Sequence, residues 1–188
     1  MLKRYLAGDE AAFTSLVRRY RRELYNFLAR FTGDKALADD VFQETFLQLH
    51  ISARTFDTSR RLKPWLFTIA ANKARDALRS RNRKRAAPLD ATVSSTDESE
   101  TTYANLMPAN IPSPEEFISN LEMRQAVQRI VSEMPENLRM VLLLCYFQDL
   151  AYKEIAEILD IPIGTVKSRL HAAVAMFAKL WKKQAKEK

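Results

Sequence analysis

Cysteine, glycine and histidine are all scarce in this chain, and their scarcity excludes several classes of protein. The single cysteine, Cys145, permits no internal disulfide, so a reducing cytosol is the expected location. The three glycines form no phosphate-binding loop, and two histidines with one cysteine do not supply the usual ligands of a zinc site. We expect no metal, no cofactor and no enzymatic activity.

Long apolar runs are also missing. The first ten residues contain no apolar stretch of signal-peptide length, and the apolar run 140–147 is too short to cross a bilayer. We therefore expect a cytoplasmic protein without membrane insertion, and we expect Cys145, inside that run, to belong to the core.

Charge is distributed unevenly along the 188 residues. Residues 1–85 hold 19 Lys and Arg against 9 Asp and Glu, residues 86–116 hold none against 6, and residues 117–188 hold 11 against 8. The net charge of +7 favours a polyanionic partner, and nucleic acid is the leading candidate. The basic, acidic, basic order indicates two folded modules and a tether.

Helical periodicity runs through the first 85 residues. Asp9 is a plausible N-cap for a long amphipathic helix whose apolar residues run from Phe13 to Phe31, and Thr32–Gly33 ends it. Asp34 can cap a second helix. Residues 52–63 lack periodicity and predict a loop, after which Pro64 begins a third helix. We expect that helix to bury Trp65, Leu66, Ile69 and Leu78.

The rest of the chain predicts a linker and a second helical module. Residues 86–113 are rich in Ser, Thr and Pro and lack Lys and Arg, which predicts a flexible acidic linker. Ser113 begins a capping box, a helix runs from there towards Glu133, and Pro135 opens another. No strand pattern is present. The predicted fold is all-α, with two small helical domains (1–85 and 114–188) joined by the linker.

The most informative stretch is Tyr152–Leu170, because it encodes two short helices separated by a turn. Pro162 pushes the residue before it out of the helical region and so interrupts the first helix. The second helix has an apolar face that we expect to be buried, comprising Val166, Leu170, Ala173, Val174 and Phe177. Near its start are donors of the kind that reach base edges and phosphates: Thr165, Lys167, Ser168 and Arg169. The pattern is that of a helix-turn-helix.

Four segments together resemble the extracytoplasmic-function, or group four, sigma factors of bacterial RNA polymerase. DDVFQETFLQLH is similar to the polymerase-binding helix of that family, and PWLFTIAANKARDALR to its minus-ten helix. MPENLRMVLLLCYF and YKEIAEILDIPIGTVKSRLHAA are similar to its minus-thirty-five module. The resemblance implies a promoter-specificity subunit that binds core RNA polymerase and promoter DNA. It also implies a possible anti-sigma partner.

By resemblance, the polymerase-binding residues are Asp39, Asp40, Gln43, Glu44 and Leu47. Their implied partner is the clamp-helix pair of the largest polymerase subunit, while the flap of the second-largest subunit is the implied partner of the second module. A polar, acidic helix face suits a complementary basic surface. The alternative is a solvated face with Asp39 and Asp40 in a first turn, where the helix dipole favours carboxylates.

Minus-ten DNA is implied to contact a set of residues in and after the loop: Phe56, Asn72, Lys73, Arg75, Asp76 and Arg79. Holding unstacked bases needs aromatic platforms, cations and an amide, and this segment carries all three. The resemblance assigns a flipped base to Asn72 and, less directly, to Phe56 and the loop 57–63. The alternatives are that Trp65 belongs to the core and that Asn72 is an ordinary exposed polar residue.

The implied contacts to minus-thirty-five DNA are Thr165, Lys167, Ser168, Arg169 and His171. Many relatives in the family carry arginines where this chain has Ala172 and Val174, which indicates weak binding by this module alone. The lysines after residue 178 either add nonspecific attraction or form a frayed terminus. Two other functions stay open at this point: a stand-alone helix-turn-helix transcriptional regulator, and a helical scaffold that binds only proteins.

Overall fold

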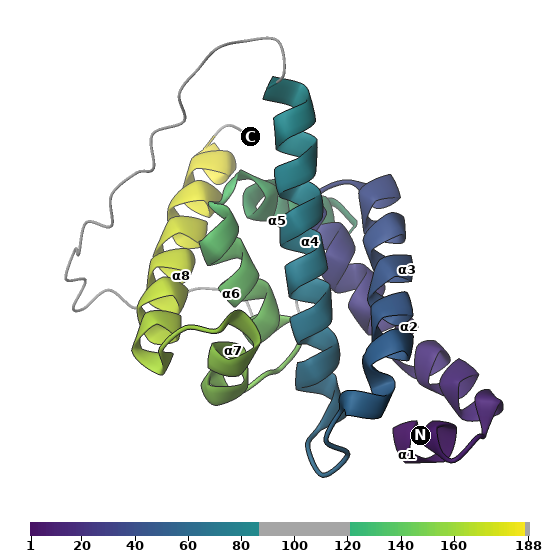
Figure 1. Cartoon of the computed structure of the whole chain (residues 1–188). Coiled ribbons are helices and arrows are strands. Elements are labelled where there is room, and N and C mark those ends of the chain that lie inside the picture. The colour runs from purple at the N-terminus through teal and green to yellow at the C-terminus, as the bar shows by residue number, and fades with distance from the viewer. Residues whose placement is uncertain (87–120, 187–188) are drawn as a thin grey trace.

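The computed structural model describes residues 1–86 and 121–186, and within these ranges every regular element is a helix (Figure 1). The elements are α1 (Leu2–Leu6), α2 (Glu10–Thr32), α3 (Lys35–Ser52), the 3-10 turn η1 (Ala53–Thr55), α4 (Leu62–Ala86), α5 (Leu121–Glu133), α6 (Glu136–Tyr146), α7 (Tyr152–Leu159) and α8 (Ile163–Lys186). The prediction of an all-α fold is confirmed. The predicted linker 86–113 lies almost wholly outside the described residues, as does the predicted helix start at Ser113.

Single residues set the ends of the first long helices. The Asp9 carboxylate accepts a hydrogen bond from the Ala12 amide at 3.1 Å, which satisfies one of the free donors at the start of α2. Gly33 ends α2 in the left-handed region, at φ 66°, a conformation that glycine adopts without steric cost. Asp34 then caps α3 through the Leu37 amide at 3.2 Å. These three predictions from the sequence are confirmed.

The segment predicted as a loop is shorter in the structure. Ser52 is the last residue of α3, residues 53–55 form η1, and only residues 56–61 are irregular. Helix α4 starts at Leu62, two residues before Pro64. Pro64 still falls in the first turn, where its missing amide hydrogen is not needed.

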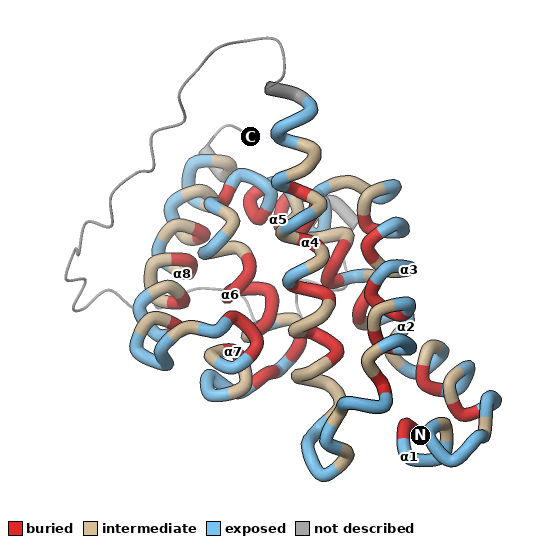
Figure 2. The backbone as a smooth tube through the Cα atoms, in the orientation of Figure 1, coloured by how far each residue is buried: buried red, intermediate tan, exposed pale blue. Residues whose placement is uncertain are grey.

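Helices α1 to α4 form the first module, and its buried stretches lie mainly on α2, α3 and α4 (Figure 2). Phe27, Phe31 and Phe67 are among the largest fully buried side chains of this module. The rings of Phe27 and Phe67 meet edge to face with their centroids 5.2 Å apart. The inner face of α4 differs from the prediction, because Trp65 and Ile69 are only half-buried. The buried residues are instead Leu66, Phe67, Ala70, Ala71, Ala74 and Leu78. The small alanines allow neighbouring helices to approach α4 closely, so the buried stripe follows them.

Helices α5 to α8 form the second module. The predicted inner face of α8 is buried at Val166, Leu170, Ala173 and Phe177, while Val174 is half-buried. Helix α7 ends at Asp160, which adopts a left-handed conformation with φ 53° and so turns the chain toward α8. Cys145 is half-buried rather than fully inside the core, and burial raises the pKa of its thiol.

The two modules pack against each other, so that buried residues of both form one continuous core. Helix α4 lies between α3 on one side and α6 and α7 on the other (Figure 1). The second half of α2 contacts α5 and α6. None of the helices in the described ranges is both long and apolar enough to span a membrane.

Candidate nucleic-acid interface

The face of α3 implied to bind polymerase is exposed. Asp39, Asp40, Gln43 and Glu44 are all solvent-accessible, and Leu47 keeps 59% of its surface exposed. Helix α3 begins at Lys35, so Asp39 and Asp40 lie beyond its first turn, which contains no acidic residue. The helix dipole therefore does not account for the two carboxylates, and the first-turn alternative is wrong.

The sequence did not single out Ile51, which extends this face. It is 65% exposed and follows Leu47 by one helical turn. The spacing of Asp40, Gln43, Glu44, Leu47 and Ile51 places them on one side of α3. The surface is therefore acidic at one end and apolar at the other. The four-residue step between Leu47 and Ile51 was the signal that could have identified it.

Aromatic rings meet where the loop joins α4. The Phe56 ring stacks on the Trp65 ring with their centroids 4.2 Å apart and their planes 21° from parallel. Both residues are half-buried, so Trp65 is not the fully buried core residue that the sequence predicted, and the contact of Phe56 with a base stays a prediction. The stack fixes the start of the loop against the helix.

Asn72 lies on the same outward stripe of α4 as Trp65, because seven residues make almost two full turns. Asp76 and Arg79 continue this stripe, and all three residues after Trp65 are exposed. The Asn72 side-chain oxygen accepts a hydrogen bond from the Arg75 guanidinium at 3.1 Å, which orients the amide. Arg79 and Asp76 form an exposed ion pair at 3.8 Å.

Lys73 and Arg75 lie on opposite flanks of that stripe. The Lys73 ammonium pairs with Glu44 of α3 at 3.5 Å, which joins α4 to the acidic surface. Arg75 faces the second module, and burial is the main reason its pKa is lowered. The nearby Arg79 and Arg169 lower the pKa of Arg75 further. Of the predicted minus-ten residues, the structure brings Asn72, Asp76 and Arg79 onto one face, which Phe56 adjoins through its stack on Trp65, and it places Lys73 and Arg75 on the flanks.

The start of α8 carries the predicted minus-thirty-five residues. Lys167 and Ser168 are exposed, while Thr165, Arg169 and His171 are half-buried. The Ser168 hydroxyl donates to the Thr165 carbonyl at 3.1 Å. Arg169 also acts electrostatically on Arg75 and helps to lower its pKa, so cations of the two predicted DNA surfaces influence each other.

Charged residues of the loop bind the first helix of the helix-turn-helix. Arg60 donates to Glu157 at 2.7 Å, and Arg61 pairs with Glu154. Beside them, the Lys63 ammonium donates to the backbone oxygen of Gln148 at 2.7 Å. Part of the loop predicted to read DNA is therefore occupied by α7. We call the first two contacts the inter-module ion pairs.

A second set of contacts holds the end of α2. The Arg139 guanidinium donates to the backbone oxygens of Phe31 at 2.7 Å, Ser132 at 2.8 Å and Met134 at 2.8 Å. Gln128 donates to the Arg30 carbonyl at 3.2 Å. The Arg30 and Phe31 carbonyls lie in the last turn of α2, where the backbone carries partial negative charge that favours a cation, whereas the Ser132 and Met134 carbonyls lie at the end of α5 and just after it.

Within residues 1–86 and 121–186, no group of three or more His, Cys, Asp or Glu side chains is placed to hold a metal ion. The candidate functional surfaces of the described residues are the α3 face, the α4 stripe with its loop, and the start of α8.

Comparison with known proteins identifies both modules. Residues 16–84 match the model of sigma-70 region 2, and residues 124–176 match that of sigma-70 region 4. The sigma factor SigW of Bacillus subtilis is 35% identical over 170 residues, which cover 90% of this chain and 89% of the relative. The sigma-E factor of Escherichia coli is 33% identical over 92% of this chain and 88% of its own.

Solved structures show the same fold. The sigma factor RpoE of Bartonella quintana, in complex with the anti-sigma factor NepR, superposes with a TM-score of 0.69 over 91% of this chain and 97% of its own, at 22% identity. CnrH, in complex with the cytosolic domain of CnrY, gives the same TM-score over 97% of this chain and 95% of its own, at 23% identity. The alignments extend far beyond the helix-turn-helix, and the chain therefore belongs to the extracytoplasmic-function sigma factors, the initiation subunits of RNA polymerase.

Proposed function

We propose that the three surfaces divide the work of promoter recognition among α3, α4 with its loop, and α8. The α3 face binds the clamp helices of the largest polymerase subunit. The exposed stripe of α4 and the preceding loop hold unstacked minus-ten bases, and the start of α8 reads the minus-thirty-five element. The protein acts in the cytoplasm as a non-catalytic specificity subunit.

One observation carries the minus-ten assignment: the half-buried Phe56–Trp65 stack and the exposed Asn72 amide lie on the same side of α4. A flipped base needs a flat surface for its ring and hydrogen bonds for its edge. Trp65 and Asn72 are separated along the helix axis by about 10 Å, the rise over seven residues. That span accommodates stacked bases next to the base held by the amide. A helical scaffold that binds only proteins would not need this combination.

The polymerase assignment is supported by the composition of the α3 face. Carboxylates steer a basic partner and fix its register, whereas exposed Leu47 and Ile51 supply apolar area at the centre of a contact. The Glu44–Lys73 pair links this surface to the minus-ten helix. Binding of polymerase to α3 would therefore compete for Glu44 and change the environment of Lys73.

The second module supports two further contacts. Lys167, Ser168 and Arg169 provide the donors of a recognition helix, and His171 follows on the same helix. The flap of the second-largest polymerase subunit is the proposed protein partner of this module. The structural neighbour RpoE was solved in complex with the anti-sigma factor NepR, and we extend that class of partner to this chain.

Full DNA binding by the loop requires the modules to separate, because Arg60 and Arg61 contact α7. The free chain should therefore bind promoter DNA weakly, and the polymerase-bound chain should bind it strongly. This difference also distinguishes the proposal from a stand-alone regulator, which would bind duplex DNA tightly by itself.

The test is run-off transcription with purified core polymerase, this chain and a genomic DNA library. Products that start downstream of a shared sequence support the assignment and reveal the promoter. On that promoter Asn72→Ala should reduce open-complex formation while leaving polymerase binding intact, and Asn26→Ala, at an exposed position of α2, is the matched control. Equal behaviour of the two variants would refute the role of Asn72, and absence of shared start sites would refute the proposed function.

A further inference from the structure

Gln148 is a buried polar residue whose side-chain oxygen has no hydrogen-bond partner among the described residues. In the part of the chain that the structure describes, the buried polar residues are Thr32, Thr45 and Gln148, and Gln148 keeps only 2% of its surface exposed. The Thr32 hydroxyl donates to the Asp34 carbonyl at 2.9 Å, and the Thr45 hydroxyl donates to the Val41 carbonyl at 2.7 Å. Gln148 is therefore the exception among these buried side chains.

Gln148 lies where the two modules meet. It follows α6, and its backbone oxygen accepts the hydrogen bond that the Lys63 ammonium of α4 donates at 2.7 Å. Lys63 also pairs with Glu23 of α2. The ring of Phe147, the residue before Gln148, has the Arg30 guanidinium of α2 at 4.5 Å from its centre. The first module therefore covers the segment of the second module that contains Gln148.

Two other buried side-chain atoms lack a partner among the described residues, the Nε atoms of Arg81 and Arg139. Arg139 of α6 bonds across the contact between the modules, because one of its other nitrogens donates to the Phe31 carbonyl of α2. Burial lowers the pKa of Arg139, and the charge of Arg81 on α4 lowers it further. Gln148 and Arg139 thus both belong to the contact between the modules, and Arg81 acts on it electrostatically.

A buried polar group without a partner costs free energy, because it has given up hydrogen bonds with water and gained none in return. Separation of the modules returns water to the groups that the contact covers. The burial of Arg30 acts in the same direction, because it lowers the pKa of Arg30 and so disfavours the charged form in the packed chain. The continuous apolar core and the inter-module ion pairs favour packing instead. The packed chain therefore balances opposing contributions.

We propose that Gln148 keeps the packed arrangement close to the point of separation, so that a small gain in polymerase binding is sufficient to part the modules. The unpaired oxygen weakens the contact at the place where Lys63 and Arg30 reach the second module. An apolar side chain of the same size at position 148 would hold the modules together more firmly. The proposal rests on the proposed function, in which the modules must separate before the loop binds DNA fully. It adds a built-in threshold to that function.

The test makes the same substitution at two glutamines of the contact. Gln148→Met removes an unpaired oxygen, whereas Gln128→Met removes a bond that is formed, because the Gln128 amide of α5 donates to the Arg30 carbonyl of α2 at 3.2 Å. Methionine is unbranched like glutamine and has only a weak acceptor. The first variant should therefore stabilise the packed form, and the second should weaken it. Gln125→Met, at an exposed position of α5, is the matched control.

Single-molecule energy transfer on the free chain measures the ratio of separated to packed molecules. One dye is attached through Glu10→Cys in α2 and the other through Lys182→Cys in α8, both exposed positions, after Cys145→Ala removes the native thiol. This labelled parent chain should show both forms. Gln148→Met should lower the ratio roughly tenfold and Gln128→Met should raise it roughly fivefold, while Gln125→Met should leave it unchanged.

A ratio that Gln148→Met leaves unchanged or raises overturns the proposal, as does a parent chain without detectable separated molecules. Gln148→Leu is a second apolar replacement that decides the matter if circular dichroism shows Gln148→Met unfolded. The energy-transfer measurement involves neither DNA nor polymerase. Failure of the threshold role therefore leaves run-off transcription by the wild type intact, whereas failure of the proposed function leaves the shifts in the ratio intact and gives no shared start sites.

Discussion

The inter-module ion pairs give a quantitative prediction for the free chain. We would replace both α7 carboxylates, Glu154→Gln and Glu157→Gln, so that Arg60 and Arg61 remain available to DNA. Glutamine at position 154 keeps an acceptor for the Ala151 amide, which donates to the Glu154 carboxylate at 3.0 Å at the start of α7. The double variant should therefore fold normally while the contact between the modules weakens.

The size of the effect follows from the exposure of the pairs. The side chains are 64% and 45% exposed in the Arg60–Glu157 pair and 71% and 17% exposed in the Arg61–Glu154 pair, so water screens both interactions. Exposed pairs contribute about 0.2–1 kcal/mol each, and two of them stabilise the contact by about 1 kcal/mol. Since about 1.4 kcal/mol corresponds to tenfold, the open fraction should rise roughly fivefold.

Promoter affinity reports this change directly, because the apparent dissociation constant varies inversely with the fraction of binding-competent molecules. Fluorescence anisotropy with promoter DNA at low salt should show the variant binding about fivefold more tightly than the wild type, and high salt should reduce the difference. A control with the same change in net charge is Glu10→Gln combined with Glu133→Gln, both exposed and unpaired within the described ranges. Equal tightening by variant and control would show that net charge alone is responsible, and the reasoning would be refuted.

Three further changes test other contacts. Arg139→Met removes three hydrogen bonds from a half-buried guanidinium and should lower the free energy of unfolding by about 2–4 kcal/mol. For a chain of this size that is a drop of roughly 4–16 °C in melting temperature. A smaller drop would mean that water replaces those bonds. Leu47→Asp combined with Ile51→Asp should abolish co-elution with core polymerase without lowering the melting temperature, and retained co-elution would contradict the assignment of α3. Asp9→Asn tests the pH dependence of stability. The hydrogen bond from Arg4 lowers the pKa of Asp9 below 3.8. The carboxylate therefore stabilises the fold fully above pH 3.8, and this stabilisation is lost as the pH falls through the lowered pKa. Melting curves of the wild type and Asp9→Asn should therefore converge in acid, and a constant difference would contradict the ion-pair explanation.

Local signals allowed most helix boundaries of the first module to be predicted from the sequence. Asp9, Gly33 and Asp34 each act on backbone groups within a few positions, so one residue type at one place is sufficient evidence. The buried stripe of α4 was harder. Large apolar residues indicated Trp65 and Ile69, but the alanines at 70, 71 and 74 decide which side can approach another helix closely.

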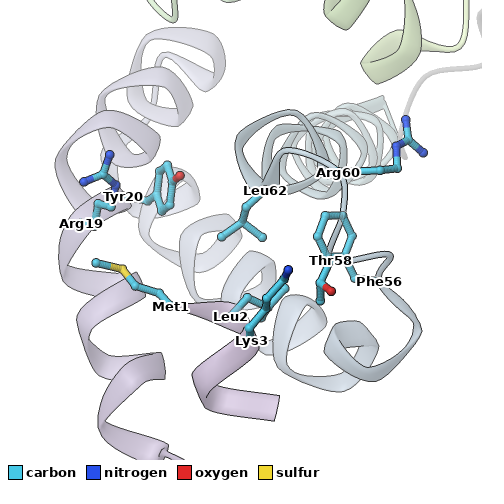
Figure 3. A pocket seen from close by; sticks show the side chains of 9 residues that line it. All are labelled: Met1, Leu2, Lys3, Arg19, Tyr20, Phe56, Thr58, Arg60 and Leu62. Atoms are coloured by element: carbon cyan, nitrogen blue, oxygen red, sulfur yellow. The ribbon is translucent and has the colours of Figure 1, made fainter. Parts of the chain in front are cut away.

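Contacts between distant segments could not be predicted. Arg60 and Glu157 are 97 positions apart, and no local pattern shows that a loop rich in cations will meet α7. The family resemblance assigned those cations to DNA, and in this arrangement they bind carboxylates of the same chain. The cavity lined by residues of α1, α2 and the loop could not be predicted for the same reason (Figure 3). Tyr20 follows helical periodicity like any half-buried residue, and it lines the cavity next to Phe56 only because these three segments meet in space.

The arrangement of the modules implies an order of events in initiation. Helix α3 lies on the side of α4 opposite to α7, so its acidic and apolar face is open while the modules are packed together (Figure 1). The loop cations Arg60 and Arg61 are not open in the same way, because Glu157 and Glu154 occupy them. The proposed polymerase surface is therefore accessible in the packed chain, whereas the proposed contacts of Arg60 and Arg61 with DNA require the modules to separate. If polymerase binds the separated form more tightly than the packed form, it raises the fraction of separated molecules. Polymerase then raises the affinity of the chain for promoter DNA, and promoter DNA raises the affinity for polymerase by the same factor. Incubating the chain with core polymerase before adding DNA should then give faster open-complex formation than incubating it first with DNA, and equal rates for the two orders would contradict this sequence of steps.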